Sequence, residues 1–106
     1  MIVRVRMLAF EELLPDGAPV IREVDVPDAE ITGSVLLDLD AVYYYGQNDF
    51  QPRECCSVSV GDVAEYAAKL WYCGRSGWLE MPEGEYVQYT AMDRRERLFS
   101  RSPSYE

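Results

Sequence analysis

Residues 57–78, which read SVSVGDVAEYAAKLWYCGRSGW, constrain the fold more than any other part of the chain. They contain two apolar runs of strand length, one rich in β-branched valines and one that begins at Leu70. The link of Ala67, Ala68 and Lys69 between them is short enough for a hairpin, although it lacks the Asn-Gly or Asp-Gly pair that favours a tight turn. This stretch therefore predicts a β-hairpin around which the other elements are organised.

A glycine-aspartate pair interrupts the first of these runs. Gly61 breaks the alternation of Val58, Val60 and Val63, and a lone glycine inside a strand is typical of a β-bulge. The carboxylate of the neighbouring Asp62 can accept backbone N–H groups that the broken ladder leaves unpaired. We interpret Gly61 and Asp62 as a structural corner rather than as a functional site.

The other segments complete an α+β pattern. Residues 2–7 alternate apolar and basic side chains, and residues 20–26 read VIREVDV, so we expect an antiparallel pair whose charged second strand lies at an edge. Residues 78–81 and 85–90 are predicted as short further strands. Of the two tryptophans, Trp71 lies in mid-strand and is expected to be the core residue.

Residues 35–45 are predicted as the main helix, bounded by a serine N-cap and a glycine stop. Leu36, Leu39 and Tyr43 fall on its apolar stripe, which Val35 and Val42 widen, whereas Asp38 and Ala41 are expected to face away. A strand is the alternative for the second half of this segment, because valine and tyrosine are poor helix formers. The pattern predicts an α+β fold with a small, twisted, mostly antiparallel sheet, open or barrel-like, and one main helix.

Length and composition predict one domain. The chain has 106 residues, of which 48% are hydrophobic, and we expect residues 1–101 to form the domain and residues 102–106 to fray. No apolar run approaches the roughly 18 residues that cross a bilayer. Arginines lie inside the first apolar run rather than ahead of it, which is unlike a signal peptide. We therefore expect a cytoplasmic protein without membrane contact.

The reactive side chains argue against catalysis. The sequence has no histidine, which excludes Ser-His and Cys-His catalysis and histidine-ligated metal sites. The three cysteines, Cys55, Cys56 and Cys73, lack C-x-x-C spacing and are an odd number for a disulfide framework. The sequence also has no glycine-rich phosphate-binding loop. We expect no enzyme activity, no cofactor and no metal.

Charge is distributed unevenly along the chain. The net charge is −9, and residues 91–106 carry a small positive excess. Residues 7–52 contain one base, Arg22, among ten acids: Glu11, Glu12, Asp16, Glu23, Asp25, Asp28, Glu30, Asp38, Asp40 and Asp49. Such a field repels nucleic-acid phosphates and favours basic partners. The alternative interpretation is that the acids only keep the chain in solution.

Tyrosines lie among these acids at the end of the predicted helix. Tyr43, Tyr44 and Tyr45 are consecutive, and successive helical residues point about 100° apart, so at least one ring faces outward. Exposed tyrosines beside acids are typical of recognition surfaces. Rings packed on the sheet with their hydroxyls in water are the alternative. The predicted partner-binding residues are Asp38, Asp40, Tyr44, Asn48, Asp49 and Phe50.

The order of these motifs resembles the YodL-like domain. The similar features are a helix with a tyrosine-rich end, an asparagine-containing loop, the run SVSVGDV at 57–63, the strand Trp71-Tyr72-Cys73 and the ending Gly77-Trp78. The resemblance covers about residues 38–81 and leaves residues 83–106 outside. The family has no established activity to carry over. Its members often sit on plasmids, phages and integrated elements, sometimes near anti-restriction proteins, so the resemblance implies a setting rather than a mechanism.

Two functions from different classes follow. The first is a non-enzymatic interaction protein whose acidic, tyrosine-bearing surface binds a basic protein, such as a DNA-handling or host-defence protein. The second is a small barrel-like domain that binds a small molecule or an oligonucleotide in its mouth, which a basic groove at residues 94–101 would favour. We expect the first, because the net charge disfavours direct nucleic-acid binding.

Overall fold

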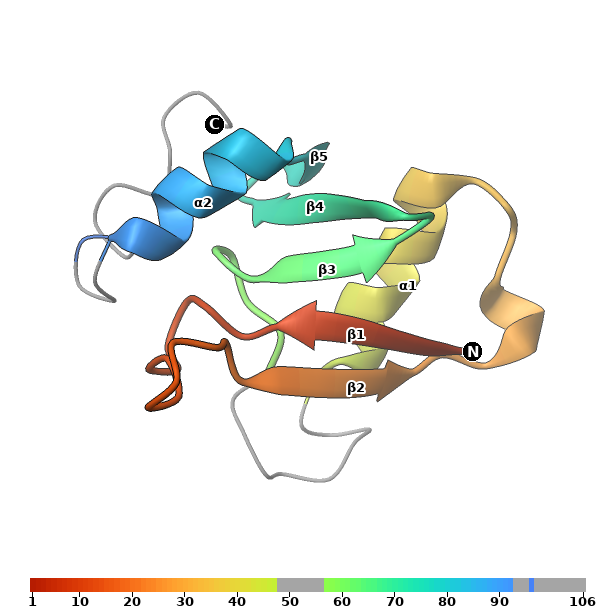
Figure 1. Cartoon of the computed structure of the whole chain (residues 1–106). Coiled ribbons are helices and arrows are strands. Elements are labelled where there is room, and N and C mark those ends of the chain that lie inside the picture. The colour runs from red at the N-terminus through yellow and green to blue at the C-terminus, as the bar shows by residue number, and fades with distance from the viewer. Residues whose placement is uncertain (48–56, 93–95, 97–106) are drawn as a thin grey trace.

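The computed structural model describes residues 1–47, 57–92 and 96, and its described part is one antiparallel sheet with two helices (Figure 1). The strands are β1 (Ile2–Arg6), β2 (Ile21–Asp25), β3 (Val63–Tyr66), β4 (Lys69–Gly74) and β5 (Gly77–Glu80), in the order β2-β1-β3-β4-β5. The helices are α1 (Val35–Tyr45) and α2 (Glu83–Ala91), and a short 3-10 turn, η1 (Asp28–Glu30), precedes α1. The predicted α+β class is confirmed. Among the described residues β2 and β5 do not pair, so the sheet is open rather than a closed barrel.

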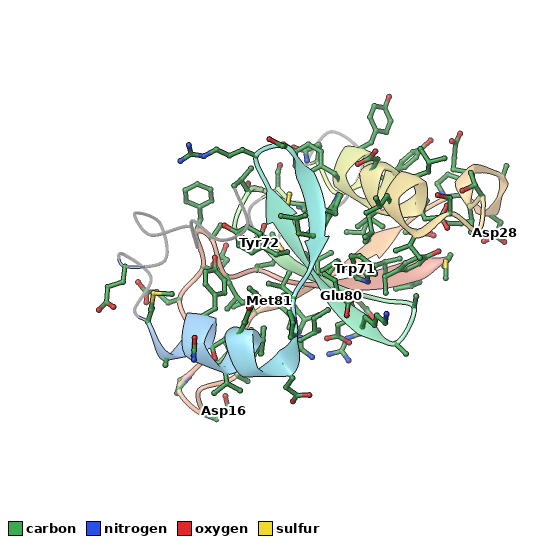
Figure 2. The ribbon with its side chains drawn as sticks, turned by 90° about the horizontal axis from the view of Figure 1, so that it is seen from above. Asp16, Asp28, Trp71, Tyr72, Glu80 and Met81 are labelled. Carbon is green, nitrogen blue, oxygen red and sulfur yellow. The ribbon has the colours of Figure 1, made fainter. Side chains whose placement is uncertain are left out.

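The two helices cover opposite faces of this sheet (Figure 2). Alternation along β1 turns Val3 and Val5 toward α1, where they form the larger core with residues of β2 and the inward side of the helix. Val63 and Tyr72 point to the other face and pack beneath α2. No helix in the described part of the chain is long and apolar enough to span a membrane.

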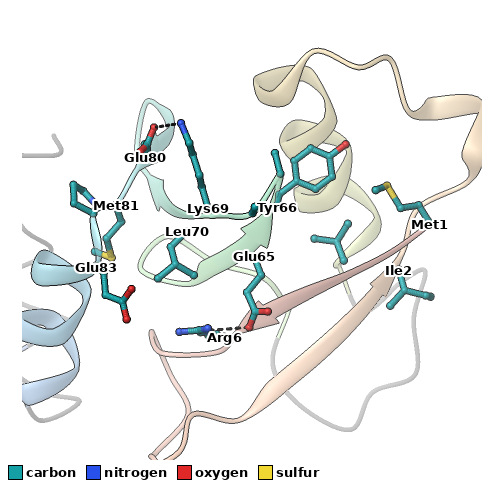
Figure 3. A pocket seen from close by; sticks show the side chains of 14 residues that line it. Met1, Ile2, Arg6, Glu65, Tyr66, Lys69, Leu70, Glu80, Met81 and Glu83 are labelled. Carbon is teal, nitrogen blue, oxygen red and sulfur yellow. Dashed lines mark hydrogen bonds and ion pairs between the residues drawn. The ribbon is translucent and has the colours of Figure 1, made fainter.

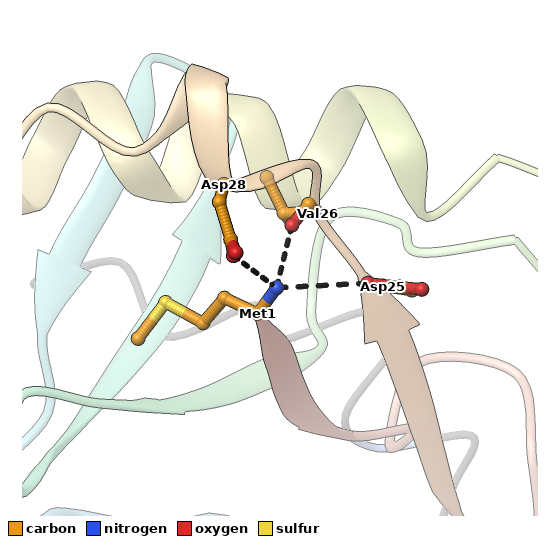
Figure 4. A network of polar contacts seen from close by, with 4 residues as sticks. All are labelled: Met1, Asp25, Val26 and Asp28. Carbon is orange, nitrogen blue, oxygen red and sulfur yellow. Dashed lines mark hydrogen bonds and ion pairs between the residues drawn. The ribbon is translucent and has the colours of Figure 1, made fainter.

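The N-terminal strands pair as the sequence predicted, with β2 at the edge. The Met1 ammonium donates to the Val26 carbonyl at 2.8 Å and to the Asp28 carboxylate at 2.9 Å, and lies 3.6 Å from Asp25 (Figure 4). These contacts raise the pKa of the ammonium, with the hydrogen bond to Asp28 contributing most. Two acids of the acidic half are therefore already paired within the chain.

β3 and β4 form the predicted hairpin, and a two-residue turn joins them. Ala67 and Ala68 both have positive φ, 52° and 61°, which is the type I′ geometry that suits the twist of a hairpin. The first strand is shorter than predicted, because it begins at Val63 rather than at Val58. Residues 57–62 instead form an irregular segment with a turn at Val60 and Gly61, which leads into the strand.

That turn places Gly61 and Asp62 opposite a single residue of β4. The Gly61 amide donates to the Cys73 carbonyl and the Cys73 amide donates to the Asp62 carbonyl, each at 2.9 Å, which is the two-against-one pairing of a bulge. Gly61 has φ of 103°, a conformation that glycine adopts most easily. The Asp62 carboxylate accepts the amides of Ala9 at 2.9 Å and Ser59 at 2.8 Å. The corner thus ties the segment after β1 to the hairpin.

The C-terminal helix corrects one prediction. Residues 85–90 were expected to form a strand, but they belong to α2. Their two tyrosines, Tyr86 and Tyr89, lie three residues apart, so a helix turns both toward the sheet, and Tyr89 is buried there. Pro82 precedes the helix, and acids in the first turn suit the positive end of its dipole.

The tryptophans also differ from the prediction. Trp78 of β5 is only 5% exposed, whereas Trp71 is partly exposed and its indole donates to the Tyr66 carbonyl at 3.0 Å. The expectation that Trp71 is the core tryptophan is wrong, because α1 packs more closely over β5 than over β4.

Candidate functional site

The exposed side of α1 carries large apolar side chains where a surface helix usually carries polar ones. Leu36, Leu37, Tyr43 and Tyr44 expose 52%, 59%, 41% and 56% of their surface, and Asp40 is exposed as well. Residues three or four apart share one side of a helix, so these five form a single stripe. We call this stripe the α1 outer face. Contiguous exposed apolar surface of this kind marks interaction sites.

The rotation of α1 about its axis differs from the prediction. Leu36 and Tyr43 were placed on the buried stripe, but both are exposed. Leu39 and Val42, which were also placed on the stripe, do point into the core, and Asp38 points there with them. The expectation that Asp38 faces away from the core is therefore wrong.

Asp38 is buried because its neighbours satisfy the whole carboxylate. One oxygen accepts the amide of Thr32 at 2.7 Å and its hydroxyl at 2.9 Å. The other accepts the amide of Gly33 at 3.2 Å and the hydroxyl of Tyr66 at 2.8 Å. The Thr32 amide contributes most to holding the pKa of Asp38 below its ordinary value, although burial acts in the opposite direction. Asp38 thus fastens the start of α1 to β3, and it is not accessible to a partner.

A pocket of about 470 Å³ adjoins the α1 outer face. It lies between the second half of α1 and the β4–β5 hairpin, and Tyr43, Tyr44 and Trp78 contribute aromatic rings to its lining. Asp40 and Arg75 add one charge of each sign. The sequence-based prediction included Asp40 and Tyr44 but missed Trp78, which only the pairing of β4 with β5 brings beside the helix.

Asp40 is an exposed acid that lines the pocket together with aromatic residues. In the described part of the chain it forms no ion pair, whereas Glu65, Glu80 and the two aspartates near Met1 each do. Asp40 is therefore a lining residue of the pocket whose charge is not neutralised by an ion pair in the described part of the chain. A ligand that carries a positive charge would complement it.

The remaining acids do not gather on the same side. Val24 points toward α1, so the adjacent Glu23 and Asp25 of β2 lie on the opposite face of the sheet. Asp16 and Asp28 lie at opposite ends of the molecule (Figure 2). The described acids of residues 7–47 are consequently spread over more than one side of the protein and do not form one continuous face.

A larger hollow of about 630 Å³ lies over the β3–β4 hairpin (Figure 3). Its two basic side chains are paired: Arg6 lies 2.9 Å from Glu65, and Lys69 lies 3.2 Å from Glu80, whereas Glu83 also lines the hollow. Arg6 also stacks on Tyr86, with its guanidinium carbon 4.7 Å from the ring centroid. Because its basic side chains are already paired within the chain, we do not assign a ligand to this hollow.

The predicted partner residues Asn48, Asp49 and Phe50 lie outside the described residues, as do Cys55 and Cys56. Among the residues that the structure describes, no three potential metal ligands of the Cys, Asp or Glu type gather in one place. Comparison of the chain with family models, with curated proteins and with solved structures finds no match.

Proposed function

We propose that this protein is a non-enzymatic interaction protein that binds a basic protein through the α1 outer face and the pocket beside it. The observation that supports this most directly is the exposure of the stripe: Leu37 and Tyr44 each leave more than half of their surface in water. Burying such side chains against a partner removes apolar area from water, and tyrosine adds contact area with little loss of conformational entropy.

The charge of the protein favours a basic partner. A net charge of −9 attracts a cationic protein and accelerates its encounter, wherever on the surface the acids lie. Asp40 then supplies a local negative charge within the stripe itself. A DNA-handling or host-defence protein has the required basic surface. The proposal also includes the resemblance to the YodL-like domain, whose members often sit on mobile elements.

A second candidate function is the binding of a small molecule. The pocket beside α1, at about 470 Å³, falls within the size range of small-molecule sites and combines aromatic walls with few polar groups. A site between α1 and the β4–β5 hairpin would then take the place of the barrel mouth that the sequence suggested.

The proposed function is tested by affinity capture at low and high salt from a lysate of the cell that encodes the protein. The informative variant combines Leu37→Ser with Tyr44→Ser. Its matched control is Val87→Ser on α2, because Val87 is 58% exposed, close to the 59% of Leu37, but lies across the sheet. We expect the parent and the control to capture a basic protein at low salt, and the double variant to lose it.

High salt should weaken capture by the parent, because screening shortens the reach of its charge. Recovery of the same proteins by the double variant and the parent would contradict the assignment of the α1 outer face. Capture of acidic proteins only would contradict the basic partner.

A further inference from the structure

We infer that the pocket beside α1 receives the cationic end of an arginine or lysine side chain from the partner. This inference rests on the proposed function and names the group that the surface recognises. It follows from three observations: which rings line the pocket, which charge is available there, and which charge opposes it.

The rings come from two different elements. Tyr43 and Tyr44 lie on the exposed side of α1, and Trp78 lies on β5, packed into the core with 5% of its surface exposed. Burial holds the indole in place, so one wall of the pocket is rigid. Cations bind over the faces of tryptophan and tyrosine rings because the ring quadrupole is negative there. Guanidinium groups use such surfaces most often.

Asp40 supplies the counter-charge. Asp40 lines the pocket and forms no ion pair in the described part of the chain. A cation placed between Asp40 and the rings would form an ion pair with the carboxylate and a cation–π contact with the rings. A neutral apolar side chain would fill the same space but would leave Asp40 without a partner.

Arg75 opposes the incoming cation. It also lines the pocket and is exposed on the β4–β5 turn. Removing its charge should therefore strengthen the binding of a cation, whereas removing the charge of Asp40 should weaken it. These opposite signs distinguish recognition of a cation from any general effect of substitution on the fold.

The test uses three capped tripeptides as probes: acetyl-Gly-Arg-Gly-amide, the lysine equivalent, and the citrulline equivalent, which is neutral and close to arginine in shape. Nitrogen-15 NMR follows the titration through the two indole signals. Trp78 reports on the pocket, and Trp71, which is not part of its lining, is the internal reference. We expect the arginine or lysine peptide to shift the Trp78 signal and to leave that of Trp71 in place.

The citrulline peptide should bind about five- to tenfold more weakly than arginine, because it loses the cation–π contact and the ion pair. Asp40→Asn should weaken arginine binding about two- to fivefold, and Arg75→Gln should strengthen it by a similar factor. The dissociation constants from the arginine and lysine titrations show which cation the pocket prefers. Both variants alter exposed side chains, and a dispersed amide spectrum confirms that they fold.

Equal binding of citrulline and arginine, no shift of the Trp78 signal, or weaker binding in Arg75→Gln would each overturn the inference. These failures are separable from failure of the proposed function. If the peptides fail but the Leu37→Ser, Tyr44→Ser protein still loses its basic partner, the docking surface stands and the cation pocket does not. If neither the peptides nor the capture experiment gives the expected result, both proposals fall.

Discussion

The backbone of the turn between β3 and β4 predicts how much a better turn sequence would raise the free energy of unfolding. Ala67 and Ala68 both lie in the left-handed region, at φ of 52° and 61°. That conformation costs a residue with a β-carbon roughly 1–2 kcal/mol. Asparagine and glycine tolerate it, and the pair Asn-Gly is the preferred sequence of a type I′ turn. We therefore expect Ala67→Asn combined with Ala68→Gly to stabilise the fold.

The net gain is smaller than the sum of the two strain energies. Glycine loses about 0.5–1 kcal/mol relative to alanine, because its unfolded chain is more flexible. Both alanines are exposed, so no packing is lost on substitution. Because asparagine relieves only part of the strain at its position, about 1–2 kcal/mol of added stability remains after the glycine cost. For a domain of this size, that corresponds to a rise in melting temperature of roughly 4–8 °C per kcal/mol.

Urea and thermal unfolding, followed by far-UV circular dichroism, measure this gain directly. Ala68→Val is the matched control, because a β-branched side chain tolerates positive φ worst and should lower stability. An Asn-Gly protein that unfolds at the same urea concentration as the parent, or a valine variant that is equally stable, would refute the assignment of strain to this turn.

Three further predictions concern the core. Burial raises the pKa of Asp62 from 3.8 to about 7, against the backbone amides that lower it, so the folded protein keeps a proton that the unfolded chain has released. As the pH rises from about 5 to about 7, the free energy of unfolding should consequently fall by about 1.4 kcal/mol per pH unit. Urea unfolding of Asp62→Asn should show no such slope. Tyr89→Phe removes the hydroxyl that donates to the buried Gly61 carbonyl at 2.6 Å, and should cost about 1–3 kcal/mol in urea unfolding; an unchanged midpoint would argue against this bond. Trp78→Ala should lower the free energy of unfolding by about 3–5 kcal/mol and Trp71→Ala by less. A lower melting temperature for Trp71→Ala than for Trp78→Ala would contradict the assignment of Trp78 to the core.

Local sequence signals predicted most of the sheet and the main helix. Alternation over residues 2–7 and 20–26 predicted β1 and β2, and a serine and a glycine bounded α1. The glycine-aspartate pair predicted a bulge. Each of these signals acts between residues close in the chain, where steric limits and backbone hydrogen bonding decide the outcome.

The identity of α2 was not predictable in this way. The segment EYVQYT is rich in residues that also favour strands, so local preference alone left its form undecided. The helix is favoured by contacts beyond the segment: Tyr89 reaches Gly61, 28 positions away, and packs edge-on against Tyr72. Tertiary packing overrides weak local preference when it buries an aromatic ring.

Only the tertiary structure decided which side chains of α1 form the candidate surface. Because α1 is apolar on more than one side, its sequence did not determine which side faces the core. Asp38 decides it, through hydrogen bonds to Thr32, Gly33 and the hydroxyl of Tyr66, and the last of these lies 28 positions away. A buried carboxylate needs all its partners at once, so the helix keeps the one rotation that satisfies it. That rotation turns Leu37 outward.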